Sequence, residues 1–167
     1  QAGVIYRTLD RGSQGICVPH VNTAAEAKNV IKAGKFPPIG ERGMFPSRQS
    51  YGVQDYFLKA NDETLFIILI EDIVAINNLE EILAVDHIDV FFVAPSDLAA
   101  SMGYISRSAD QTVLDTINDA LAKIIRSGKI AGTLVTDKNI SHYREIGVRL
   151  FATPVHNWIS DGIENLV

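Results

Sequence analysis

The chain has 167 residues, 47% hydrophobic and 21% charged, which is the composition of one globular domain over residues 1–167 and excludes a disordered segment. Its net charge of −5 argues against nucleic acid or an anionic membrane as the main partner, because both require a basic surface. Cys17 is the only cysteine, which excludes a disulfide framework and fits a reducing, cytoplasmic location.

The first predicted element is the end of an amphipathic helix over residues 3–12. Val4, Ile5 and Leu9 share one face of this helix, and Gly12 would close it. The segment has no apolar core preceded by basic residues, so it does not read as a secretory signal. Because no predicted strand precedes the helix, we expect the sequence to begin inside a fold.

Continuous apolar runs then predict five strands, over residues 15–21, 64–70, 89–95, 129–135 and 148–155. The runs lack strict alternation, which is typical of strands buried on both faces of a parallel sheet. Helices are predicted between or after them, over residues 23–31, 77–85, 108–128, 140–146 and 158–167. The Pro-, Gly- and Arg-rich segment 36–56 is predicted to be a long loop, and such loops usually carry function.

Five alternating strands and helices fit either an open doubly wound sheet or part of an eight-stranded barrel. The sequence contains neither GxGxxG nor GxxxxGK[ST], the phosphate-binding motifs of nucleotide folds. Their absence favours the barrel modestly.

Two neighbouring strands are each followed by an acid. Glu71 follows the second strand and Asp97 follows the third, at the edge where parallel α/β folds bind ligands. Paired carboxylates there suit a hard divalent cation. Two alternatives remain open: each acid is a polar residue or helix cap at a strand end, with Asp97 capping a turn over 98–100, or Asp72 faces the site in place of Glu71.

Further candidates lie in the turn 94–98 and in the loop around Arg42. Backbone N–H groups in a tight turn after a strand can hold a carboxylate, although Pro and Ser also favour an ordinary turn. Arg42, between Gly40 and Gly43, can bind a substrate carboxylate in two-point geometry or form a structural ion pair.

Histidine spacing gives little support for a zinc site, because neither HxH nor HExxH occurs. His20 and His156 follow the first and last strands, so both could reach the edge that carries Glu71. We expect surface positions for the other two histidines, His87 and His142. Cys17, inside a strand, is expected to be a small core residue.

Four strings in order resemble the HpcH/HpaI-type class II aldolases of the aldolase/citrate lyase superfamily: GICVPHVNTAAEA, FPPIGERG, ANDETLFIILIED and DVFFVAPSDLAASMGY. The usual family forms are PmV-(N/D)TAEEA, YPP-G-RG, a Q-I-E strand end and GPaDLsaslG. The resemblance covers essentially the whole chain and includes the spacing of the two acids. It implies a (β/α)8 TIM barrel of the phosphoenolpyruvate/pyruvate type, of which this chain would be the C-terminal portion with strands 4–8.

The resemblance also implies a reaction, the cleavage of a 4-hydroxy-2-oxo acid to pyruvate, or a related 2-oxo acid, and an aldehyde through a metal-stabilised enolate. Glu71 and Asp97 would bind Mg²⁺, Mn²⁺ or Co²⁺. The residues that would contact the substrate are Ala94, Pro95, Ser96, Asp97 and Leu134, with Arg42 as a further candidate.

The matching family residue for Asp10 reaches the active site of an adjoining subunit, which implies a homo-oligomer, a trimer or hexamer by resemblance. Leu69 stands where the family often has a substrate-contacting Gln, and Ala94 replaces a usual Gly. The family's general-base His and oxo-binding Arg belong to β/α units that precede this sequence, so the general base is not in the chain. Alternatives are a citrate-lyase-like or malyl-thioester lyase, or a catalytically silent metal- and oxo-acid-binding fragment.

Overall fold

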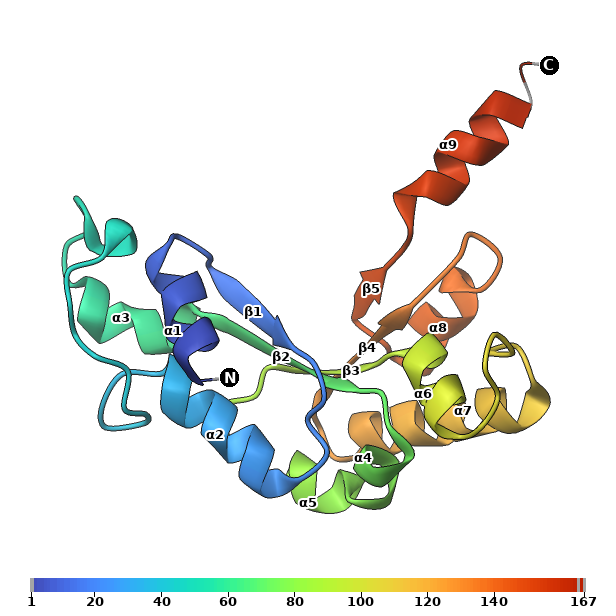
Figure 1. Ribbon diagram of the computed structural model, residues 1–167, viewed down its shortest axis with the longest axis horizontal. Helices are drawn as coiled ribbons and strands as arrows, with labels where there is room; N and C mark the ends of the chain where they lie inside the picture. The colour runs from blue at the N-terminus through green and yellow to red at the C-terminus, as the bar shows by residue number, and fades with distance from the viewer. Residues whose placement is uncertain (1, 165, 167) are drawn as a thin grey trace.

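The structure is a computed structural model that describes residues 2–164 and residue 166. Its described part contains one parallel sheet in the order β1-β2-β3-β4-β5 (Figure 1). The strands are β1 (Gly15–Val18), β2 (Leu65–Ile70), β3 (Val90–Val93), β4 (Ile130–Leu134) and β5 (Leu150–Ala152). Spatial order therefore equals chain order, as in a barrel that winds in one direction.

Helices connect the strands, and Figure 1 shows α2, α5 and α7 along one side of the curved sheet, with α9 extending away from it. Their bounds are α1 (Ala2–Asp10), α2 (Ala24–Gly34), α3 (Tyr56–Glu63), α4 (Ile73–Asn77), α5 (Leu79–Leu83), α6 (Pro95–Ser101), α7 (Gln111–Arg126), α8 (Ile140–Ile146) and α9 (Val155–Glu164), with a 3-10 turn η1 (Arg48–Ser50). Within residues 2–164, no helix has both the length and the hydrophobicity needed to span a bilayer.

The two faces of the sheet are buried to different extents. On the helix-covered face, the register row Val18, Ile68, Phe91 and Ala131 is at most 6% exposed. On the other face, the neighbouring row begins with Cys17, which is exposed. The prediction that the strands are buried on both faces therefore holds for β3, which is buried at all four positions, and for the middle of β4, but it is wrong for β1.

The cause is the curvature of the sheet. In a closed barrel the inner face is covered by side chains from the opposite strands. The five described strands curl only part of the way round, so the inner face at β1 remains open. The same reason corrects the expectation for Cys17, which points to the open face and is not a core residue.

Most predicted elements form, with shorter strands than expected. The helix predicted over 77–85 forms as the shorter α5, and α4 precedes it as a further helix. Asn78 lies between the two, and its side chain donates to the carbonyl of Asn22 at 2.9 Å. The last strand ends at Ala152, and α9 begins at Val155, inside the predicted strand 148–155. The predicted end of that helix includes residues 165 and 167, which lie outside the described residues.

Capping residues in the sequence predicted where several helices begin and end. Gly12 follows α1 with a φ of 114°, a left-handed conformation that glycine adopts without steric cost. The Thr23 hydroxyl accepts from the Glu26 N–H at 3.2 Å, and Glu26 in turn accepts from the N–H of Asn22 at 2.7 Å. Asp110 caps α7 by accepting from Thr112 N–H at 3.1 Å.

Close packing of α2 against β2 generates a stability prediction. A Cβ on Gly34 would overlap the ring of Phe66, a fully buried side chain that cannot withdraw. We expect Gly34→Ala to lower the free energy of unfolding by about 1–3 kcal/mol, the usual cost of overpacking. Gly43→Ala is the control, since its Cβ would meet no atom within 4 Å. Urea unfolding of the intact protein measures both, and equal stabilities for the two variants would contradict the packing.

Candidate active site at the carboxyl edge of the sheet

The parallel register brings the ends of β2 and β3 together. Ile70 pairs with Val93, and the N–H of Ala94 donates to the carbonyl of Ile70 at 3.1 Å. Glu71 and Ala94 are therefore the first residues beyond two adjacent strand ends. Asp97 lies in the first turn of α6, directly after that position. The sheet thus places both predicted acids at the same edge.

Glu71 is 3% exposed, and its Oε1 accepts a hydrogen bond from the backbone N–H of His20 at 2.8 Å. The Nδ1 atom of His20 lies 3.2 Å from the same oxygen. Asp72 has a different role, because its Oδ1 accepts from the N–H of Val74 at 2.8 Å and caps α4. Of the two adjacent acids, Asp72 is a helix cap and Glu71 is the buried carboxylate.

Burial of Glu71 requires compensation, because a buried carboxylate is costly unless it is paired or neutralised. In the described part of the chain, no lysine or arginine forms an ion pair with it. The described hydrogen bonds reach only Oε1. A cation held at the remaining oxygen would supply the compensation that the protein does not.

The donor set fits a hard divalent cation. Among the described residues, no group of three or more His, Cys, Asp or Glu side chains could hold a metal ion alone. Mg²⁺ and similar ions often take only one or two carboxylates and complete their shell with water and substrate oxygens. Glu71 and Asp97 offer such a set.

The predicted substrate residues lie at the same edge. Ala94 is buried at the N-terminus of α6, whereas Ser96 and Asp97 are exposed on its first turn. Because α6 begins at Pro95, Asp97 lies within the helix, and the alternative that it caps a turn over 98–100 is wrong. Leu134 ends β4, the strand next to β3.

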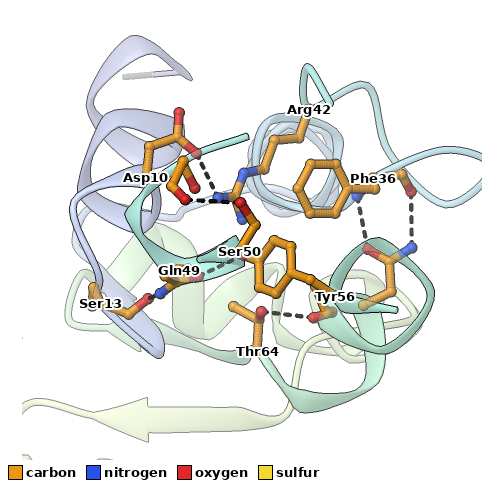
Figure 2. A network of polar contacts seen from close by, with 11 residues as sticks. Asp10, Ser13, Phe36, Arg42, Gln49, Ser50, Tyr56 and Thr64 are labelled. Atoms are coloured by element: carbon orange, nitrogen blue, oxygen red, sulfur yellow. Dashed lines mark hydrogen bonds and ion pairs between the residues drawn. The ribbon is translucent and has the colours of Figure 1, made fainter. Parts of the chain in front are cut away.

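Arg42 and Asp10 lie at the opposite, amino-terminal edge of the sheet. The Arg42 side chain is buried, its Nη2 lies 2.6 Å from Oδ1 of Asp10, and its guanidinium stacks 4.5 Å from the Phe36 ring centre (Figure 2). The N–H of Arg42 donates to the carbonyl of Lys35, whose ammonium group contacts the carbonyl of Thr64, the residue before β2. Within one chain, this pair is therefore separated from Glu71 by the length of the strands.

The loop 36–56 is tied down by the same network. Figure 2 shows Gln49 donating to the carbonyl of Ser13 and accepting from the hydroxyl of Tyr56, the latter at 2.5 Å. The Asn61 side chain bonds both backbone groups of Phe36, at 2.7 and 3.0 Å. These contacts hold the loop against α1 and α3. Hydrogen bonds within the chain therefore account for the conformation of the loop.

His87 and His142 are exposed, as expected, and His156 is exposed in the first turn of α9. One further acid at the carboxyl edge was missed. Asp137 follows β4, and both its oxygens accept from the indole N–H of Trp158 at 3.1 Å. The position of Asp137, three residues after the end of β4, is the sequence feature that could have identified it.

Cys17 shares the open face of the sheet with the site. Partial desolvation raises the pKa of the Cys17 thiol, and the negative charge of Glu71 raises that pKa further. Cys17, Leu69 and Glu71 lie on the face of the sheet opposite the helices, so the charge of Glu71 acts on the thiol across that face.

The comparisons with known proteins agree on one family. The model of the HpcH/HpaI aldolase/citrate lyase family matches residues 2–156. A hydroxypyruvate/pyruvate aldolase of Roseovarius nubinhibens is 38% identical over 157 residues, covering 91% of this chain and 61% of the relative. A 4-hydroxy-2-oxovalerate aldolase of Novosphingobium aromaticivorans is 37% identical over 157 residues, covering 92% and 60%.

Solved structures identify the fold. An HpcH/HpaI aldolase/citrate lyase family protein from Burkholderia cenocepacia superposes with a TM-score of 0.92 at 26% identity, over 99% of this chain and 68% of that one. The structural neighbours are TIM-barrel-like, so the five curled strands are confirmed as an incomplete barrel. The chain spans about 60% of the length of the curated relatives it matches.

The Arg42–Asp10 ion pair generates a prediction that separates a structural role from substrate binding. Asp10→Asn leaves the buried guanidinium without its anion, so we expect a loss of about 1–3 kcal/mol, less than for a fully buried pair because Asp10 is partly solvated. Glu41→Gln, which breaks the exposed Lys32–Glu41 pair, should change stability by less than about 0.5 kcal/mol. Urea unfolding compares the two, and an unchanged midpoint for Asp10→Asn contradicts the structural role.

The effect of Glu71 on Cys17 can be measured by alkylation. Removing the charge with Glu71→Gln should lower the thiol pKa, and so raise the rate of iodoacetamide labelling at pH 8, because the thiolate is the reactive form. Mass mapping of the peptide that contains Cys17 gives the rate. Asp72→Asn is the control, since Asp72 caps α4. Equal rates for wild type and Glu71→Gln would place the two groups further apart than the structure does.

Proposed function

We propose that this chain, which belongs to the HpcH/HpaI aldolase/citrate lyase family, forms the metal- and oxo-acid-binding part of a metal-dependent aldolase. The proposed reaction cleaves a 4-hydroxy-2-oxo acid to pyruvate, or a related 2-oxo acid, and an aldehyde. Relatives named as aldolases of hydroxypyruvate, 4-hydroxy-2-oxovalerate and 4-hydroxy-2-oxo-heptane-1,7-dioate support this substrate class. The observation that carries the proposal is the buried carboxylate of Glu71 beside the 94–97 turn, with which no lysine or arginine of the described residues forms an ion pair.

Glu71 and Asp97 would hold the cation in this proposal, Mg²⁺, Mn²⁺ or Co²⁺. When bound, such a cation acts as a Lewis acid that draws electron density from the oxo and carboxylate oxygens of a substrate. Glu71 contributes a side chain whose position is set by stiff backbone, because it follows β2 directly. Asp97 approaches from the adjacent strand end on α6.

The same edge supplies the proposed substrate contacts. Ser96 offers a hydroxyl and a backbone N–H to the substrate carboxylate, and Ala94 and Pro95 shape the turn that presents them. Leu134, half-buried on β4, offers an apolar wall. No residue of this chain is assigned as the base that accepts the substrate's 4-hydroxyl proton.

Asp10 and Arg42 could join a substrate site only across a subunit interface, because they lie at the other edge of the sheet. Their part in substrate binding, and the homo-oligomer that it requires, therefore belong to the proposal. Arg42 is less able than Asp10 to contact a neighbouring subunit, because the Arg42 side chain is buried and Asp10 is partly exposed.

The metal assignment is tested by three variants of the intact protein. Glu71→Gln and Asp97→Asn should abolish calorimetric Mn²⁺ binding and lower kcat/KM for retro-aldol cleavage at least about 100-fold, since Lewis-acid stabilisation is worth several kcal/mol. Asp72→Asn, the matched neighbour that only caps α4, should keep both. Retained Mn²⁺ affinity in Glu71→Gln would refute the assignment. Parallel assays with a citryl or malyl thioester would identify a thioester lyase instead.

A further inference from the structure

His20 has an unusual backbone conformation for its residue type. Its φ of 56° lies in the left-handed region, which non-glycine residues adopt uncommonly and mostly where surrounding structure requires it. Here the conformation directs the backbone N–H of His20 at the buried carboxylate of Glu71, at 2.8 Å. The strained backbone thus coincides with a contact to the candidate metal ligand.

The imidazole reaches the same carboxylate. Nδ1 lies 3.2 Å from Oε1 of Glu71, which is contact distance between the ring and the carboxylate. Both described contacts therefore converge on one oxygen, although the two residues are 51 positions apart. No described residue donates a hydrogen bond to Oε2.

The two side chains differ in their exposure to solvent. The Glu71 side chain is 3% exposed, whereas that of His20 is 73% exposed. The imidazole therefore covers Glu71 from the solvent side and is not part of the core.

We propose that His20 is a positioning residue: its N–H and Nδ1 fix Oε1 of Glu71 and so present Oε2 to a divalent cation. This inference rests on the proposed function, because it assumes a cation at Glu71. Hydrogen-bond donors behind a metal ligand typically change metal affinity 10- to 100-fold. Since the backbone N–H remains in any variant other than proline, loss of the imidazole should cost the lower end, about 10-fold.

His20→Gly is the informative variant, because glycine keeps the left-handed backbone and its N–H while removing the ring. His87 provides a matched control. It is also exposed and left-handed, with a φ of 66°, but it lies in the turn between α5 and β3. His87→Gly therefore makes the same chemical and conformational change away from Glu71.

The experiment measures Mn²⁺ affinity by calorimetry and urea unfolding of the metal-free intact protein. We expect His20→Gly to raise the Kd for Mn²⁺ about 10-fold without loss of metal-free stability, and His87→Gly to leave the Kd unchanged. His20→Asn should restore much of the affinity, because asparagine tolerates the left-handed region and its amide can donate to Oε1.

Two results would overturn the inference while leaving the proposed function intact. One is a His20→Gly Kd within twofold of wild type, which would mean that the backbone N–H alone positions Glu71. The other is a weakened Kd that accompanies lost metal-free stability and is not restored by His20→Asn, which would indicate a merely structural residue. If wild type does not bind Mn²⁺, or Glu71→Gln binds it equally well, the proposed function fails and the inference fails with it.

Discussion

The carboxylate of Glu71 is held at the end of β2 with its charge desolvated, and no lysine or arginine of the described residues forms an ion pair with it. Such a group is stable only if hydrogen bonds and a nearby cation or proton replace the water it has lost. His20, two residues after the end of β1, supplies the first part of that replacement, and the register of β2 and β3 brings Asp97 to the same edge. The chemistry proposed for the chain follows from this one desolvated charge.

The two edges of the sheet carry different kinds of residues. The amino-terminal edge carries contacts that serve stability, including the Arg42–Asp10 pair and Lys35, whose ammonium group sits over the Phe66 ring. Burial lowers the pKa of Lys35, and the charges of Asp89 and Asp62 partly oppose that shift. The carboxyl-terminal edge carries Glu71 and Asp97, the two acids of the proposed metal site. This division is the usual one in barrels of parallel strands, where chemistry gathers at the carboxyl ends.

Several parts of this arrangement could be predicted from the sequence because they depend on local pattern. The five apolar runs, the caps at Thr23 and Asp110, and the acids at two strand ends are all local signals. The choice between Glu71 and Asp72 was not local, because Glu71 is held by the backbone N–H of His20, 51 positions away. The break at Asn78 depends on a bond to Asn22, 56 positions away, and the exposure of Cys17 depends on how far the sheet curls.

Trp158 is the only tryptophan among the 167 residues, and its indole N–H is anchored to Asp137 just beyond the end of β4. An indole that is half exposed and hydrogen-bonded to a carboxylate has an emission spectrum sensitive to small changes around it. The chain therefore contains an intrinsic optical probe at the carboxyl edge of the sheet. Rearrangement of α9 against that edge would register as a change in tryptophan fluorescence, without any label.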